Sequence, residues 1–450
     1  MMRLSWVQPE DLVGHELRQA EEDGRDASAV ARRWLDAGGE LSPALAGASP
    51  SPASAELRAL AGELLDELAL LPGATTEPTG LVEIKALCPQ WTDDCGSHEP
   101  ELGRVHGAWL GRAVGCLLGK PVEKIPRAGI EEIARATGNW PIRQYFTEVG
   151  LPEEIATRWP WNRRSRPTSL IENIDGMPED DDLNYPLLAL TLLERTGPGF
   201  TTEDVADLWL AELPAGRTFT AERIAYRNLL LGHSPPETAS YRNPFREWIG
   251  AQIRADLFGW INPGKPGAAA EAAWRDAVLS HTANGVYGAM FVAAAVSAAA
   301  VLDEPLLWLR AGLSVVPPQS RLAVAVRDAI VAAQEEEDWG RVLDRIYDSH
   351  GHLHWVHAVN NCALVAAAVV HGRGDFEASI CRVVAGGWDT DSNGATVGSL
   401  LGARLGVDAL PREWTDPLKN RLATTVAGMD GIGFDELAAR TVAVAGKGKR

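Results

Sequence analysis

Hydrophobic residues recur every three or four positions along most of this chain, the spacing of helices that bury one face. Gly and Pro separate most of these segments, and few of them alternate with the two-residue period of a strand. The pattern therefore predicts an all-α protein. The expected helices cover residues 103–118, 186–195, 203–212, 220–231, 267–279, 285–302, 319–336, 338–347, 360–371, 376–385, 393–405 and 433–444.

The first hundred residues differ from the rest of the chain. Glu10–Ala37 and Glu56–Leu71 have helical periodicity with charged faces. Between them, Leu41–Ala55 is rich in Ser, Pro, Ala and Gly, which is typical of a loop or linker. We expect residues 1–100 to form a helical accessory region and residues 101–450 to form a compact multi-helix domain.

One apolar stretch raises the question of a membrane span. Ala277–Leu302 contains no Asp, Glu, Lys or Arg. It consists mostly of Ala, Gly and Val, and alanine is far less lipophilic than leucine. We interpret it as a buried helix whose small residues allow close packing, and we expect no membrane association.

Charge and cysteine content narrow the functional classes. The formal net charge of −19 argues against a nucleic-acid-binding protein, which would carry a basic face. The five cysteines are odd in number and show no Cys-x-x-Cys spacing, and the N-terminal residues show no export signal. A reduced, cytoplasmic protein is the expectation.

Two acidic clusters carry the candidate chemistry. Asp180–Asp182 precedes an apolar run, and Asp389–Asn393 follows the pair Gly386-Gly387. Carboxylates packed this tightly repel one another unless a cation lies between them, and oxygen ligands without thiolates suit Mg²⁺, Mn²⁺ or Ca²⁺. A pair of such clusters suggests a two-metal site with the candidate ligands Asp180, Asp181, Asp182, Asp389, Asp391 and Ser392.

Each cluster also has a purely structural interpretation. Asp180–Asp182 could cap a helix, because acids interact favourably with a helix N-terminus. Asp389–Asn393 could form a turn that caps the following helix. Thr92-Asp93-Asp94 has no apolar helix behind it, so we interpret it as a turn. The histidines at 350, 352, 354 and 357 do not have the spacing of a zinc site.

Glycines recur along one candidate helix. Gly107, Gly111, Gly115 and Gly119 lie four residues apart, so another backbone can approach that face closely. Pro121 ends this helix, and Glu123 follows at its C-terminal edge. By itself, the segment is a packing motif with an exposed glutamate.

A long irregular segment, 139–178, combines five aromatic residues with Arg163, Arg164 and Arg166. Such a loop could stack a base and bind phosphates. The alternative is a surface loop packed by its own tryptophans.

Together and in this order, these motifs resemble the ADP-ribosylglycohydrolase family. The resemblance covers about residues 101–410. The matching segments are Gly119–Glu123, Asp180–Leu183, Ser280–Gly285 and Gly386–Asn393.

The resemblance implies a catalytic domain with two Mg²⁺ ions, or Mn²⁺, held by the ligands named above. Asp391 would bridge the ions, and Glu123 and Asp391 are the catalytic candidates. The candidate substrate-binding residues are His281, Asn284, Trp388, His357 and Asn361. The implied activity is hydrolysis of the ribosyl C1″ bond of an ADP-ribosylated protein or small molecule. Alternatives are a glycosidase for a smaller ribosyl compound or nucleoside, and a non-catalytic binding or structural protein.

The chain departs from the family pattern in four places. Asp180 and Leu183 replace threonines, Cys116 replaces an aspartate, and Trp388 is an insertion. These departures, with the additional N-terminal region, suggest a bacterial branch whose substrate need not be ADP-ribosyl-arginine. The oligomeric state stays open.

Overall fold

The computed structural model describes residues 6–73 and 76–446. In these ranges the chain forms 23 α-helices and five short 3-10 helices, and its only β-type pairings are isolated bridges. The all-α prediction is confirmed.

All twelve helices expected for the larger domain are present, with boundaries shifted by a few residues. They are α5 (Leu102–Gly119), α9 (Asp181–Thr196), α10 (Thr202–Glu212), α11 (Thr220–Leu230), α14 (Pro266–Ala277), α15 (Ala283–Ala299), α17 (Arg321–Glu335), α18 (Trp339–His350), α19 (Ala358–His371), α20 (Phe376–Ala385), α21 (Thr390–Leu405) and α23 (Phe434–Ala445). The largest shift is at α9, which begins at the acidic cluster itself rather than five residues later.

The sequence pattern missed the other helices of this domain. Most are too short for apolar periodicity to be visible. Pro126 directly precedes α6 and Pro305 begins α16, and a proline in the sequence usually indicates that a helix is interrupted. They are α6 (Arg127–Ala136), α7 (Glu153–Arg158), α8 (Arg166–Ser169), α12 (Glu237–Ser240), α13 (Asp256–Trp260), α16 (Pro305–Ser314) and α22 (Arg412–Thr415).

The apolar stretch forms a central helix of the core. Every residue of α15 is buried, mostly Ala, Gly and Val side chains that let α13, α14 and α16 pack around it. No helix in the described ranges is long and apolar enough to cross a bilayer. The interpretation as a buried helix is confirmed.

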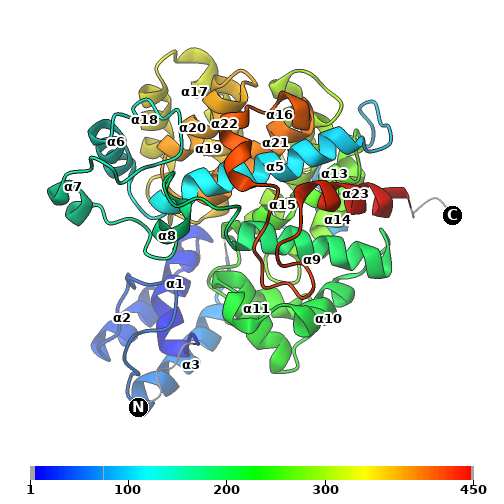
Figure 1. Cartoon of the computed structure of the whole chain (residues 1–450). Coiled ribbons are helices and arrows are strands. Elements are labelled where there is room, and N and C mark those ends of the chain that lie inside the picture. The colour runs from blue at the N-terminus through cyan, green and yellow to red at the C-terminus, as the bar shows by residue number, and fades with distance from the viewer. Residues whose placement is uncertain (1–5, 74–75, 447–450) are drawn as a thin grey trace.

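The glycine face of α5 packs directly on α21. A Cβ at Gly111 or Gly115 would overlap a backbone carbonyl of α21, and Gly398 and Gly394 on α21 meet α5 in the same way. Thr390 Oγ1 donates a hydrogen bond of 2.8 Å to the carbonyl of Gly119. Because the backbones touch, the C-terminal end of α5 is held beside the N-terminal end of α21 (Figure 1).

The N-terminal region forms helices α1 (Pro9–Glu22), α2 (Ser28–Asp36), α3 (Ala55–Ala69) and α4 (Leu81–Leu87). In Figure 1, α1, α2 and α3 form a group at one side of the larger domain, below the C-terminal end of α5. The chain then follows the surface of the domain: Thr79 accepts a hydrogen bond from the Trp274 indole (2.8 Å), and Cys95 donates one to Gly264 (2.9 Å).

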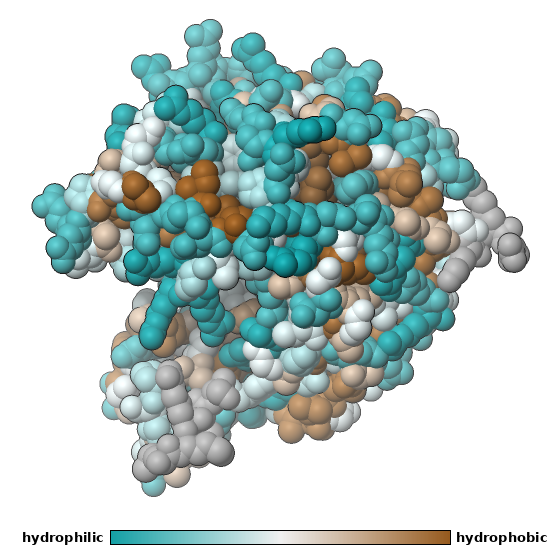
Figure 2. Space-filling view, viewed as in Figure 1, coloured by the Kyte–Doolittle hydropathy of each residue, from teal (hydrophilic) through white to brown (hydrophobic). Residues whose placement is uncertain are grey.

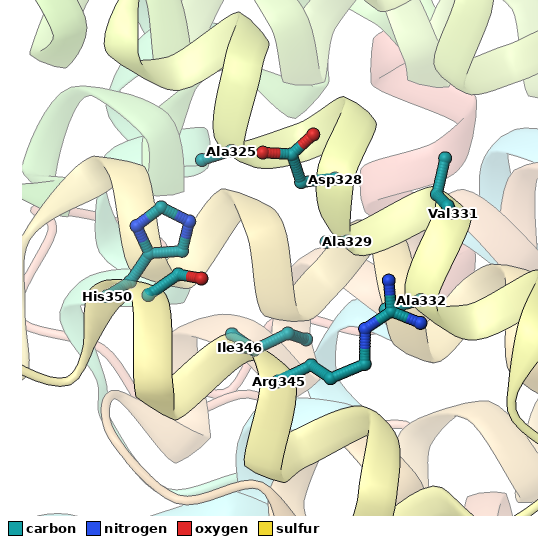
Figure 3. A pocket seen from close by; sticks show the side chains of 9 residues that line it. Ala325, Asp328, Ala329, Val331, Ala332, Arg345, Ile346 and His350 are labelled. Carbon is teal, nitrogen blue, oxygen red and sulfur yellow. The ribbon is translucent and has the colours of Figure 1, made fainter.

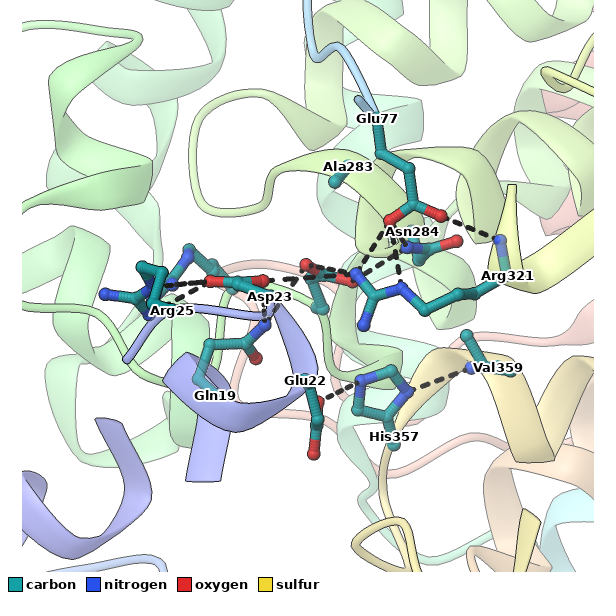
Figure 4. Close-up of polar contacts among 12 residues, drawn as sticks. Gln19, Glu22, Asp23, Arg25, Glu77, Ala283, Asn284, Arg321, His357 and Val359 are labelled. Carbon is teal, nitrogen blue, oxygen red and sulfur yellow. Dashed lines mark hydrogen bonds and ion pairs between the residues drawn. The ribbon is translucent and has the colours of Figure 1, made fainter. Parts of the chain in front are cut away.

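A largely buried ion-pair network fixes this region to the domain (Figure 4). Arg321 pairs with Glu77 at 2.7 Å and with Glu247 at 2.8 Å. Arg246 pairs with Glu16 on α1 at 2.9 Å. Ion pairs that are withdrawn from water cost free energy when either partner is removed, so the network holds the N-terminal helices in one position.

A pocket of about 210 Å³ lies between α17 and α18 (Figure 3). Asp328, Arg345 and His350 are its charged or titratable lining residues, and the rest of the lining is mostly alanine and other aliphatic side chains. None of its lining residues belongs to either acidic cluster.

The α5–α21 contact predicts that Gly115→Val destabilises the protein. A valine there must push the two backbones apart, so we expect the free energy of unfolding to fall by about 1–3 kcal/mol. Denaturation in guanidinium measures it. Gly103→Ala is the matched control on the same helix, because a Cβ at Gly103 meets no atom within 4 Å. Equal stability of the two variants would contradict the close approach.

Candidate metal centre

The two acidic clusters converge at helix N-termini. Asp180 is the N-cap of α9, and its side chain accepts a hydrogen bond from the backbone N–H of Asp182 (2.9 Å). Asp389 occupies the N-cap position of α21, and Asp391 lies in the first turn. The structural interpretation of Asp180 as a cap is therefore confirmed, and the cap also places the acids of α9 beside those of α21.

Mutual repulsion shows how close the carboxylates lie. Burial raises the pKa of Asp181 well above its usual range, and the charges of Asp180 and Asp391 raise it further. The pKa of Asp389 is raised well above its usual range by burial and by Asp391 and Glu123. Burial, with Glu123 and Asp180, raises the pKa of Asp391 to about 7. Carboxylates from three separate segments are thus close enough to interact electrostatically.

Lys120, the first residue after α5, provides a cation inside this cluster. Its Nζ forms an ion pair with Asp180 and a hydrogen bond of 3.3 Å with the carbonyl of Glu179. Both side chains of the pair are less than a tenth exposed. Burial alone would lower the pKa of Lys120, but Asp180, Cys116 and Asp391 raise it above the usual range.

Arg112 lies earlier on α5 and forms an ion pair with Asp182. Its Nη2 pairs with Asp182 at 3.1 Å, and its Nη1 pairs with Asp256 at 2.8 Å. The Arg112 side chain is completely buried. Asp182 is therefore oriented by a cation from the interior of the protein.

Cys116 lies between Arg112 and Lys120 in the chain. Its Sγ is 3.8 Å from Asp182 Oδ2, and one donor atom each from Cys116, Asp180 and Asp182 lie within 4.8 Å of one another. This group of donors could hold a metal ion.

Glu123 borders the cluster from the 3-10 turn that follows α5. Its side chain is 18% exposed and accepts a hydrogen bond from Asn162, while Lys124 Nζ lies 3.1 Å from its Oε1. Asn162 is fixed in turn by its backbone N–H, which donates to Pro121 (2.9 Å). Glu123 is thus oriented and still reachable from solvent.

Asn361 and Trp388 shape the N-terminal end of α21. Asn361 Oδ1 accepts hydrogen bonds from Asn393 Nδ2 (2.6 Å) and the backbone of Asp389 (3.3 Å). Trp388 stacks on Tyr347 with ring centroids 4.3 Å apart, and its φ of 60° is a backbone conformation that costs a bulky residue energy. This strained residue directly precedes Asp389. Ser392 is buried beside Asp391 Oδ1, to which its backbone N–H donates (3.1 Å).

Three of the predicted substrate-binding residues have polar partners outside the acidic clusters. His357 Nε2 is 3.1 Å from Glu22 on α1, and Asn284 Nδ2 donates to Glu77 (2.7 Å) and Glu247 (2.9 Å) (Figure 4). His281 is fully buried, with Nδ1 2.8 Å from Ser280 Oγ. Substrate binding by these residues stays a prediction; His357 and Asn284 contact the N-terminal region in the structure.

The sequence pattern missed the internal cations and Asn162. Arg112 and Lys120 could have been recognised as candidates for buried cations, because each is a charged residue in an otherwise small and apolar run. Asn162 gave no signal, because its role depends on a contact with Glu123 across a loop. Thr92–Asp94 forms the expected turn, in which Asp94 accepts from the backbone of Gly96 (2.8 Å).

A model of the family described as ADP-ribosylglycohydrolase matches residues 97–448. The chain belongs to the ADP-ribosylglycohydrolase family. A solved structure described as an "ADP-ribosylglycohydrolase-related protein complex" is 22% identical, covering 76% of this chain and 97% of its own, with a TM-score of 0.46. No curated protein matches the chain.

The residues of the two acidic clusters fit divalent metal ions. Asp181, Asp389 and Asp391 form no ion pair with any side chain in the described ranges, although they are largely withdrawn from water. Oxygen donors of this kind suit Mg²⁺ and Mn²⁺, and a cation among them would offset the repulsion that raises their pKa values.

We predict that Lys120→Met destabilises the metal-free protein. The substitution leaves the Asp180 carboxylate buried without its cation, which costs about 3–5 kcal/mol. Thermal and chemical denaturation measure the loss. Lys120→Met combined with Asp180→Asn should recover most of it, because no unpaired charge remains. Wild-type stability of the single variant would show that the pair carries no such energy.

Proposed function

We propose that this chain is a divalent-metal-dependent hydrolase that cleaves the glycosidic bond at the ribosyl C1″ of an ADP-ribosylated protein or small molecule. The observation that supports it most is the convergence of Asp181, Asp389 and Asp391 with Glu123 at one site. Buried carboxylates that repel one another destabilise a structural protein. In an enzyme that binds cations, the same carboxylates serve as metal ligands.

The metal ligands in this proposal are the two acidic clusters. Asp181, Asp389, Asp391 and Ser392 would hold two Mg²⁺ or Mn²⁺ ions, with Asp182 oriented by Arg112 and Asp180 by Lys120. Bound ions of this kind orient the hydroxyls of a sugar and stabilise developing negative charge.

Glu123 is the proposed group for proton transfer. Its carboxylate is partly exposed, so water and substrate can reach it, and Asn162 and Lys124 fix its direction. A positioned carboxylate that removes a proton from the attacking water accelerates such a step by about 10²–10⁴-fold. Departure of the leaving group gives the sugar ring the character of an oxocarbenium ion, which nearby carboxylates stabilise.

The test is a metal-supplemented activity screen over ADP-ribosyl-arginine, ADP-ribosyl-serine, O-acetyl-ADP-ribose and simple nucleosides. We expect Mg²⁺- or Mn²⁺-dependent release of ADP-ribose or ribose from one of them. Turnover of nucleosides alone would favour the smaller substrate class. Tight ADP-ribose binding without hydrolysis of any conjugate would favour a non-catalytic binding protein.

Asp391→Ala and Asp181→Asn should each lower turnover at least about 100-fold, because each removes an acid from the cluster that binds the cations. Calorimetric titration with Mg²⁺ should show weakened binding in the same variants. Asp93→Asn is the matched control, since Asp93 is an exposed aspartate of the surface turn before α5. Wild-type turnover in either site variant would refute the proposed mechanism.

A further inference from the structure

The N-terminal region meets the larger domain through a group of histidines. His15 lies on α1, and His354 and His357 lie in the segment between α18 and α19. His15 is buried, and its ring centroid is 6.2 Å from that of His354. His357 is completely buried, and its Nε2 lies 3.1 Å from Glu22 of α1. Histidines thus come together from both sides of one interface.

Aromatic rings of the domain surround His15 and His354. The His15 centroid is 5.0 Å from that of Phe245 and 5.8 Å from that of Trp248. His354 stacks on Trp248, with centroids 4.1 Å apart and an angle of 12° between the ring planes. Phe245 and Trp248 carry no charge. A proton added to either imidazole would place a positive charge against apolar rings, which costs free energy.

The ring nitrogens are arranged for neutral imidazoles. His15 Nε2 is 3.0 Å from the carbonyl of Leu45, so this nitrogen carries the proton. His15 Nδ1 is buried without a hydrogen-bond partner in the described ranges. His354 Nδ1 accepts from the backbone N–H of Val356 at 3.5 Å. A second proton would therefore meet no acceptor at His15 and a donor at His354.

Most charges that act on the two rings are positive. Burial, with His15, Arg18 and His357, lowers the pKa of His354 to about 3. Burial also lowers the pKa of His15; the charge of Arg18 acts in the same direction, and a backbone hydrogen bond and the Asp11 carboxylate oppose it. These effects outweigh the attraction of an aromatic face for a cation.

No carboxylate in the described part of the chain forms an ion pair with His15 or His354. The acids of the interface pair with other cations: Glu22 with His357 at 3.1 Å, Glu16 and Asp23 with Arg246 at 2.9 and 2.8 Å, and Glu247 with Arg321 at 2.8 Å. Burial raises the pKa of Glu247, so this carboxylate adds a separate pH-dependent contribution, which histidine variants distinguish from that of the rings.

We propose that His15 and His354 make the docking of the N-terminal region sensitive to pH, so that the region is docked at neutral pH and released in acid. Release would free His357 and Asn284 from Glu22 and Glu77. Figure 2 shows the surface hollowed between the N-terminal helices and the segment of α7 and α8, so solvent reaches this boundary on one face. The switch does not depend on the proposed function.

The lowered pKa values of the two rings fix the direction of the effect. After release, water surrounds both imidazoles, and each pKa returns toward 6.5. Docking is therefore strongest above about pH 6.5 and weakens as the pH falls below this value toward the pKa of the docked rings. At about pH 5.5, His354 alone favours release about tenfold, and His15 acts in the same direction.

Hydrogen exchange measures this docking in the full-length protein. Peptides from α1 and from residues 350–357 are followed by mass spectrometry at about pH 7.5 and about pH 5.5, with times scaled for the intrinsic exchange rate. Helix α16 is the internal reference, because it packs on α15 and α19. Relative to α16, wild-type protein should lose protection in both segments at least about tenfold at the lower pH. His15→Gln/His354→Phe should lose little, because neither replacement takes up a proton.

His371→Phe is the matched control and should behave like the wild type. Burial also lowers the pKa of His371, but this histidine ends α19 and contacts the carbonyl of Glu337 at 3.1 Å. Equal protection of the wild type at both pH values would overturn the proposal, and so would an equal loss in the double variant.

An NMR titration of the histidine ring signals in the wild type is the second measurement, and it requires no variant to fold. The signal of His354 should titrate far below pH 6.5 while the region is docked. A midpoint near 6.5 with α1 still protected would show that docking does not oppose protonation, and the pH switch would be refuted.

Discussion

The architecture of the centre depends on the direct backbone contact between α5 and α21. Because both helices have glycines at the contact, no side chains separate them, and the backbone at the end of α5 touches the backbone at the start of α21. This rigid contact forces Asp389 and Asp391 toward the acids of α9 despite their repulsion. The packing energy of the helices therefore holds an arrangement that electrostatics alone would disperse.

The charges of the centre are balanced locally. Asp180 adds a negative charge where the family has a neutral threonine, and Lys120 places a positive charge directly against it. Asp180 of the acidic motif and Lys120 of the glycine-rich motif thus form one ion pair. Arg112 does the same for Asp182 and Asp256 from the interior. The acids left without a protein cation are those that the metal proposal needs most.

The N-terminal region makes specific polar contacts with the larger domain. Its α1 supplies Glu22 to His357, and the segment after α3 supplies Glu77 to Asn284, so two residues predicted to bind substrate also contact the N-terminal region. Trp6 of the same region stacks on Arg223. Polar and aromatic contacts thus join the N-terminal region to several elements of the larger domain.

The sequence by itself determined the helical class and the site motifs. Apolar periodicity and Gly or Pro breaks located the longer helices, because both signals are local, and the order of the acidic motifs indicated the family. Only the tertiary structure decided which partner each polar residue meets. Asn284 and His357 lie in sequence beside site-like motifs, yet Asn284 donates to Glu77 and His357 pairs with Glu22, both from the N-terminal region. Such contacts depend on how distant segments pack, and no local pattern encodes them.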